Sequence, residues 1–234
     1  MEKRDELWPR GPCFYYDTAL FPPGTDSFLP RLLCPPVPRR HGLRPRQRDW
    51  SSRNAPARAP RNRFLSKMLR SPRPRQRFAR KTFAENGWAD RAAFHEGDLR
   101  DVSVLPKAGS VDYVISNPPY FPAGSGESAK CEARQIAREE TSCTLDDVCA
   151  AAQRVLRYGG RFTLVHRAER LADVLCAMRS HGIEPKRLRF LAKSPDAAPS
   201  LLFVEGKRGG KSGLVIEPPL VPNGEEWDAV YFRK

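Results

Sequence analysis

Long apolar runs, paired cysteines and clustered histidines are missing from these 234 residues, and each absence excludes a class of protein. No stretch approaches the ~18 apolar residues of a membrane span, and the first residues carry no apolar signal-peptide core. The 6 cysteines form no Cys-x-x-Cys pair and the 4 histidines are scattered, which argues against a zinc site and a disulfide framework. We therefore expect a soluble cytoplasmic protein without a metal ion and without contact to a membrane.

Acidic residues are almost absent from one segment. Residues 29–80 hold 16 of the 41 lysines and arginines but only one of the 27 acids, Asp49, so this segment carries the whole excess of the +14 net charge. Because nine prolines interrupt it, no long helix or central strand is expected there. We predict disorder over 30–80, with the first cleavage by trypsin between residues 31 and 78.

Glycine is scarce in the same segment, where Gly42 is the only one and no Gly-x-Gly-x-x-Gly or Asp-x-Gly-x-Gly occurs. A glycine turn of the kind that binds a nucleotide cofactor is therefore not recognisable there. Three interpretations of the segment compete: a disordered arm that binds RNA phosphates, a solvated linker, or a stretch translated out of frame from a GC-rich gene.

From residue 81 onward the pattern alternates helices with strands. This alternation, finished by a hairpin, predicts an α/β fold: a Rossmann-like, doubly wound sheet with an antiparallel terminal strand, whose first two strands are not recognisable. The start of one helix is marked by Thr144 and Asp147, which form a capping-box-like pair. The expected elements are a helix that ends at Gly87, strands over 92–98, 111–116 and 161–166, a helix from Leu145 to Gly159, a helix that ends at Gly182, and a hairpin of strands 187–192 and 200–205.

The strongest signal is Asn117-Pro118-Pro119-Tyr120, which directly follows the apolar strand 111–116. A residue before proline is held extended, so the Asn117 side chain should project from the strand end. Its amide oxygen and the Pro118 carbonyl are two acceptors that can hold both N–H groups of a planar amine, while Tyr120 stacks on the flat substrate. We therefore predict these four residues as the catalytic site of an amino-group methyltransferase.

With these elements in place, the chain resembles the class I S-adenosylmethionine-dependent methyltransferases, most closely the bacterial tRNA N6-adenine methyltransferases that modify valine tRNA. The resemblance implies S-adenosylmethionine as cofactor and tRNA as partner. It also implies that Asp98 contacts the cofactor's adenine, and that Asp26 and Asn117 line the cofactor pocket. The likeness is carried by Phe21–Leu29, Glu96–Asp101 and Val111–Phe121, with further matches at Leu156–Phe162 and Pro218–Leu220.

The resemblance divides the chain into an N-terminal family segment (1–29), the basic segment (30–80) and a catalytic domain (81–234). Asp26 and Asn117 are about as far apart as the family places them, so the residues between them are replaced rather than deleted. This favours the out-of-frame interpretation. Because the replaced residues would include the glycine turn, we expect the chain as written to bind the cofactor weakly.

The remaining candidates concern the substrate. Arg134, Lys186, Arg187 and Arg189 are predicted to contact the tRNA backbone, with ordinary solvated side chains as the alternative. His166 lies in a predicted strand and is expected to be packed or capped. A protein glutamine or guanine N2 would use the same two acceptors as adenine N6, and a non-catalytic RNA-binding protein is the alternative from another class. The oligomeric state does not follow from the sequence.

Overall fold

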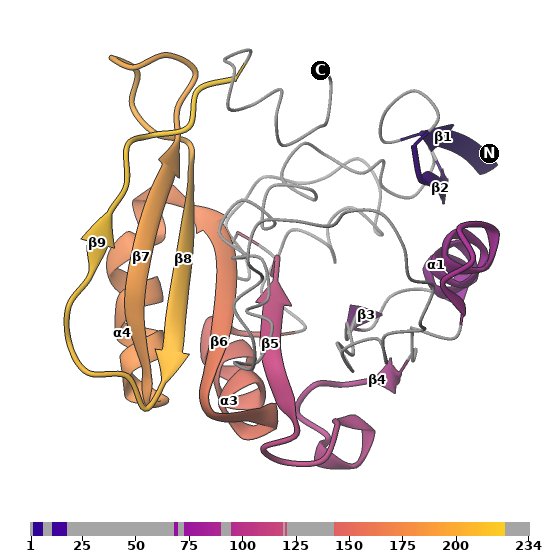
Figure 1. Ribbon diagram of the computed structural model, residues 1–234, viewed down its shortest axis with the longest axis horizontal. Coiled ribbons are helices and arrows are strands. Elements are labelled where there is room, and N and C mark those ends of the chain that lie inside the picture. Colours follow the sequence, from indigo (N-terminus) through magenta and orange to yellow (C-terminus); the bar gives the residue numbers. More distant parts are fainter. Residues whose placement is uncertain are drawn as a thin grey trace, which may run out of the picture.

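The computed structural model describes residues 2–6, 11–17, 68–69, 73–89, 95–118, 120 and 143–222. At its centre is a five-stranded sheet in the order β5-β6-β8-β7-β9 (Figure 1). Strands β5, β6, β7 and β9 run in one direction, and β8 is antiparallel to both of its neighbours. The predicted hairpin is confirmed as β7 and β8, but its antiparallel strand β8 lies between β6 and β7 inside the sheet and not at the terminal position that we expected. The strands span Val111–Ser116 (β5), Leu156–Arg167 (β6), Ile183–Leu191 (β7), Leu201–Arg208 (β8) and Val215–Ile216 (β9).

Two helices, α3 (Leu145–Val155) and α4 (Leu171–Ser180), cover one face of this sheet (Figure 1). The predicted capping box starts α3: the Thr144 hydroxyl accepts from the Asp147 N–H at 3.2 Å, and the Asp147 carboxylate accepts from the Thr144 N–H at 3.0 Å. Short 3-10 helices span Val102–Val104 and Ala168–Arg170. The predicted α/β Rossmann-like class is confirmed. The core between helices and sheet includes Val148, Ala152, Leu156, Phe162, Leu164, Val174, Met178, Leu188, Leu202 and Val204.

The strand β6 begins earlier than its sequence predicts. Helix α3 ends at Val155 rather than at Gly159, and the next residue already pairs with β5. Val111 of β5 pairs with Leu156 of β6, and Tyr113 pairs with Arg161. An advance of two residues along β5 therefore matches an advance of five residues along β6, and the extra residues of β6 form a bulge. Gly159 has a φ of +77°, which a side chain would strain, so this glycine shapes the bulge instead of ending the helix.

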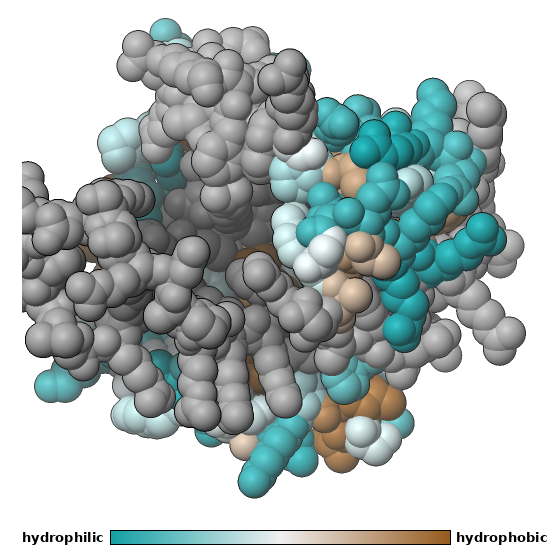
Figure 2. All heavy atoms as spheres, turned by 45° about the vertical axis from the view of Figure 1, so that its right-hand side comes forward, coloured by the Kyte–Doolittle hydropathy of each residue, from teal (hydrophilic) through white to brown (hydrophobic). Residues whose placement is uncertain are grey.

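A small unit at the N-terminus packs beside α1 (Arg73–Glu85). It is an antiparallel hairpin of β1 (Glu2–Glu6) and β2 (Cys13–Asp17). The Asn86 side chain joins it to the helix end, because its oxygen accepts from the Cys13 N–H at 3.0 Å and its nitrogen donates to the Cys13 carbonyl at 2.8 Å. Figure 2 brings this side of the molecule forward and shows mainly hydrophilic side chains on its described surface.

Part of the basic segment is ordered, which differs from the disorder expected over 30–80. Strand β3 (Met68–Leu69) pairs in parallel with β4 (Glu96–Gly97), and α1 begins at Arg73. Proline is compatible with this start because Pro74 lies in the first helical turn, where the backbone N–H groups have no intrahelical partner. Among the described residues, no helix is long and apolar enough to cross a membrane.

Candidate active site

The candidate active site begins where β5 ends. The predicted strand 111–116 is confirmed, and Ser116 pairs with Leu164 of β6 at its last step. The chain then leaves the sheet with Asn117 exposed and Pro118 buried. A projecting amide followed by an anchored proline is the local geometry expected from a residue that precedes proline. Pro119 lies outside the described residues.

Asn117 and Tyr120 contact each other directly. The Tyr120 hydroxyl donates to the Asn117 Oδ1 at 2.5 Å, although we had expected that oxygen to serve the substrate alone. An amide oxygen has two lone pairs, so one acceptor position remains for a substrate N–H group. In this structure the amide oxygen, rather than the amide nitrogen, faces the tyrosine hydroxyl.

The Tyr120 ring in turn rests on His166 of β6. The two ring centroids are 5.5 Å apart and the planes meet at 63°, an edge-to-face contact. His166 is fully buried, as the sequence had led us to expect, and this burial, followed by the nearby Arg170, lowers its pKa to about 4. The imidazole is therefore neutral at pH 7. We did not predict the contact between His166 and Tyr120. The only signal in the sequence was that His166 follows Leu164, the partner of Ser116, by two residues.

The low pKa of His166 predicts a stability loss in mild acid. The unfolded histidine takes up a proton near pH 6.5 and the folded one only near pH 4, so stability falls as pH drops through this window. At ~1.36 kcal/mol per pKa unit, the loss at pH 4.5 is about 2.5 kcal/mol. Urea unfolding at pH 7.5 and 4.5 measures this loss. Between the two pH values His166→Gln should lose less stability than the wild type, and His181→Gln serves as the control. A parallel loss in the wild type and His166→Gln would contradict it.

Asp98 follows β4 in a tight turn that it stabilises itself. Its Oδ1 accepts from the Arg100 backbone N–H at 2.9 Å and from the Arg100 Nε at 3.0 Å, and its Oδ2 accepts from Nη2 at 2.5 Å. Leu99 is buried in the same core cluster as Val148 of α3 and anchors the turn there. The carboxylate is thus held in one orientation by a bidentate partner, which also raises the pKa of Arg100.

Three of the basic residues predicted to bind tRNA, Lys186, Arg187 and Arg189, lie on β7. Two of them, Arg187 and Arg189, bond to other parts of the protein. The Arg187 Nε donates to Glu217 at 2.6 Å, and the Arg189 Nε donates to the Pro218 carbonyl at 2.9 Å. Arg189 has only 7% of its surface exposed, which does not support contact with a phosphate. Lys186 donates to the Lys211 carbonyl at 3.1 Å and stays exposed at its head. These side chains hold the segment that follows β8 against strand β7.

A polar cluster crosses the sheet on the face opposite α3 and α4. The Tyr113 hydroxyl lies 2.5 Å from the Thr163 hydroxyl and donates to the Glu205 carboxylate at 3.0 Å, while Arg161 forms an ion pair with the same carboxylate. Thr163 and Glu205 are fully buried. The sequence reasoning missed this cluster, although a charged Glu205 at the end of an apolar strand was a signal for it.

Like Pro119, the predicted site residues Asp26 and Arg134 lie outside the described residues. Within the described part of the chain, the structure brings Asn117 and Tyr120 together with His166, and it places Asp98 in a separate turn. In that same part, no three histidine, cysteine or acidic side chains are grouped so that they could hold a metal ion.

No family model matches the chain, but individual proteins do. A tRNA1(Val) (adenine(37)-N6)-methyltransferase of Aeromonas salmonicida is 35% identical over 105 residues, which are 45% of this chain and 42% of that protein. A protein of the same name from Phocaeicola vulgatus is 28% identical over 131 residues, 55% of this chain and 53% of that protein. The chain thus spans about half the length of the curated relatives it matches.

Among solved structures, a predicted O-methyltransferase from Agrobacterium tumefaciens superposes with a TM-score of 0.56. It covers 71% of this chain and 76% of its own, at 16% sequence identity, and at that identity the likeness concerns the fold. The resemblance found in the sequence is therefore confirmed at two levels. The chain has the fold of a methyltransferase and is similar, over about half its length, to proteins named tRNA1(Val) (adenine(37)-N6)-methyltransferases.

Proposed function

We propose that this protein transfers a methyl group from S-adenosylmethionine to an exocyclic amino nitrogen, adenine N6 of a tRNA being the substrate. The observation that carries the proposal is the Asn117 Oδ1, held by Tyr120 at the end of β5 and followed by the buried Pro118. The named relatives support the choice of tRNA, because their names give this reaction.

The residues of the site act on the amine by orientation. The lone pair of an aromatic amine is delocalised into its ring, which makes the nitrogen a poor nucleophile. When Asn117 and the Pro118 carbonyl accept both N–H groups, the nitrogen is fixed in one direction. Tyr120, supported by the neutral His166, holds the Asn117 amide and bounds the space for the base. A cationic nitrogen then loses its proton readily, so no histidine base is needed.

The described residues fit one end of the cofactor, whose bound form supplies the electrophilic methyl. Asp98 presents a fixed carboxylate after β4, which suits the amine of the cofactor's adenine. We assign the contact with the cofactor's adenine to Asp98, whereas Asn117 lines the cofactor pocket and adds little to cofactor affinity. The methionine end has no counterpart among the described residues, so the fit covers the adenine end.

We expect weak cofactor binding, because residues 29–80 contain no glycine turn of the kind that binds a nucleotide cofactor. Each missing hydrogen bond forfeits about 0.5–1.5 kcal/mol, so several of them raise Kd by orders of magnitude. Calorimetry on the 234-residue chain should give a Kd far above micromolar, weakened further in Asp98→Ala. Micromolar binding by the wild type would show that residues 29–80 supply contacts which the sequence does not reveal.

The function itself is tested with the full chain, an unmodified valine tRNA transcript and methyl-labelled cofactor at high concentration. Nuclease digestion and mass spectrometry should find the label on N6 of adenosine. Label on guanine N2, or on a protein glutamine, would overturn the choice of substrate. Absence of transfer to any amino group at saturating cofactor would overturn the proposed function.

A further inference from the structure

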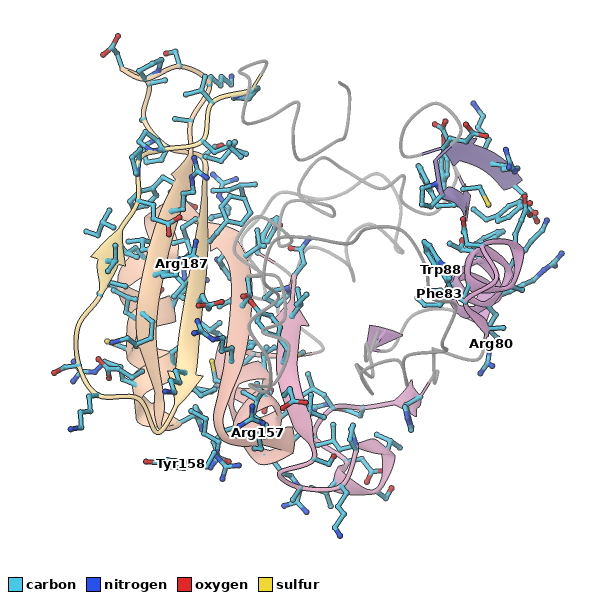
Figure 3. The ribbon with its side chains drawn as sticks, viewed as in Figure 1. Arg80, Phe83, Trp88, Arg157, Tyr158 and Arg187 are labelled. Carbon is cyan, nitrogen blue, oxygen red and sulfur yellow. The ribbon has the colours of Figure 1, made fainter. Side chains whose placement is uncertain are left out.

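An exposed aromatic ring lies at the end of the sheet opposite Asn117. We call this the amino end, because β5, β6 and β7 begin there; it comprises residues 107–112, 154–160, 179–186 and 207–213. Tyr158 has 76% of its surface exposed, the largest value among the exposed large hydrophobic residues that the structure describes. Figure 3 shows Tyr158 and Arg157 together at this end, far from the tip of β5.

The tyrosine is exposed but held in place. It lies in the bulge of β6, which carries it away from the sheet. Its hydroxyl donates to the Gly209 carbonyl at 3.2 Å, and its ring lies directly over that glycine. A Cβ added at Gly209 would come within 2.2 Å of the Tyr158 ring, so the absence of a side chain there makes room for the ring. A fixed ring presents its face to a ligand without loss of side-chain freedom.

Positive charge surrounds this ring. The Arg157 Nη1 donates to the Tyr158 carbonyl at 3.3 Å, and Lys207 passes close to the bulge, 3.7 Å from a Cβ built on Gly159. Two acids balance part of the charge, because Asp112 pairs with Arg157 and Glu184 pairs with Arg179. The cations of the amino end are Lys107, Arg154, Arg157, Arg179, Lys186, Lys207, Arg208 and Lys211.

We propose that the amino end is an RNA-binding site, in which an unpaired base stacks on Tyr158 and the neighbouring phosphates contact Lys207 and the other cations. A rigid aromatic face bordered by cations is how proteins bind single-stranded nucleic acid. The choice of RNA as ligand rests on the proposed function. Strand β5 joins the two ends of the sheet: Val111, the partner of Leu156 at the start of the bulge, precedes Ser116 by five residues, or roughly 17 Å at ~3.3 Å per residue. A structured RNA can span that distance while its target base enters the site at Asn117.

The test measures binding of the full chain, without cofactor, to a fluorescent valine tRNA transcript over a range of salt concentrations. Tyr158→Ala should weaken RNA binding about tenfold. The ratio of its Kd to that of the wild type should stay the same at high salt, because salt screens the contacts of the basic segment with phosphates but does not screen stacking. Tyr158→Phe keeps the ring but loses its bond to the Gly209 carbonyl, so it should bind only slightly more weakly than the wild type and much more tightly than Tyr158→Ala. Lys207→Ala should lower the salt slope by about one. Lys193→Ala, an exposed lysine beyond the other end of β7, is the matched control.

Equal binding by wild type and Tyr158→Ala at all salt concentrations would overturn the inference, and so would an equal loss in Tyr158→Phe and Tyr158→Ala. Photocrosslinking of 4-thiouridine RNA gives an independent readout, since the crosslinked peptide should contain Tyr158. The inference and the proposed function fail separately. If the wild type transfers methyl groups and Tyr158→Ala binds RNA as tightly as the wild type, only the amino-end site is rejected. If Tyr158→Ala binds RNA more weakly but the wild type transfers no methyl group, only the proposed function is rejected.

Discussion

Replacing Asn117 with alanine is expected to lower kcat about 10²-fold, with little change in cofactor affinity. The variant loses one of the two acceptors that orient the substrate amine, and removal of one preorganised polar partner typically costs this much. The measurement is methyl transfer to valine tRNA at saturating cofactor and RNA. Because Asn117 is exposed and its side chain bonds to Tyr120 in the same loop, the fold should be unaffected.

Two neighbouring variants sharpen this experiment. Ser116→Ala alters the preceding residue without touching either acceptor and should keep kcat within a fewfold of wild type. Tyr120→Phe keeps the ring on His166 but removes the hydroxyl that fixes the Asn117 amide, so it should lose only part of the rate. If Asn117→Ala turned over as fast as Ser116→Ala, the assignment of Asn117 as the orienting acceptor would be wrong.

Replacing Glu205 with alanine is expected to lower the free energy of unfolding by about 3 kcal/mol. The carboxylate is fully buried, forms an ion pair with Arg161 and accepts from the Tyr113 hydroxyl at 3.0 Å. Its removal leaves these partners without their acceptor in a place that water does not reach easily, and breaking a buried pair typically costs 3–5 kcal/mol. We expect the lower end because the Arg161 side chain is 42% exposed and can partly hydrate.

Urea unfolding of Glu205→Ala measures this loss against Glu169→Ala. Glu169 also pairs with an arginine, Arg167, but its side chain is 63% exposed, so its removal should change stability by less than about 0.5 kcal/mol. The double variant Glu205→Leu, Arg161→Met should recover part of the loss, because it removes both charges together. Equal stability of Glu205→Ala and Glu169→Ala would mean that the buried carboxylate contributes nothing.

Several elements could be predicted from the sequence because their signals are local. The capping box of Thr144 and Asp147, the apolar strand before Asn117 and the helix stop at Gly182, whose φ is +67°, all depend on residues within a few positions of one another. Neighbouring side chains and backbone angles decide such features, so no knowledge of the rest of the chain is required.

The same local rules misjudged Gly159 and Gly160. A glycine pair after an apolar helix indicates a helix end, yet here it lies inside β6. Gly160 has the Asp112 carbonyl 3.2 Å from where a Cβ would stand, so a partner strand far away in the sequence decides what this glycine does. Local pattern alone does not separate a helix stop from a bulge.

By itself the sequence determined the α/β class and the strand that ends directly before Asn117 and Pro118, because both follow from proline geometry and short-range periodicity. Only the tertiary structure decided which charged side chains are available to a ligand. Arg189 donates a hydrogen bond to the Pro218 carbonyl, and Glu205 forms an ion pair with Arg161. Tyr158, by contrast, is exposed at the far end of the sheet. The physical reason is that a side chain's partner depends on strand order, and strand order joins residues that are dozens of positions apart.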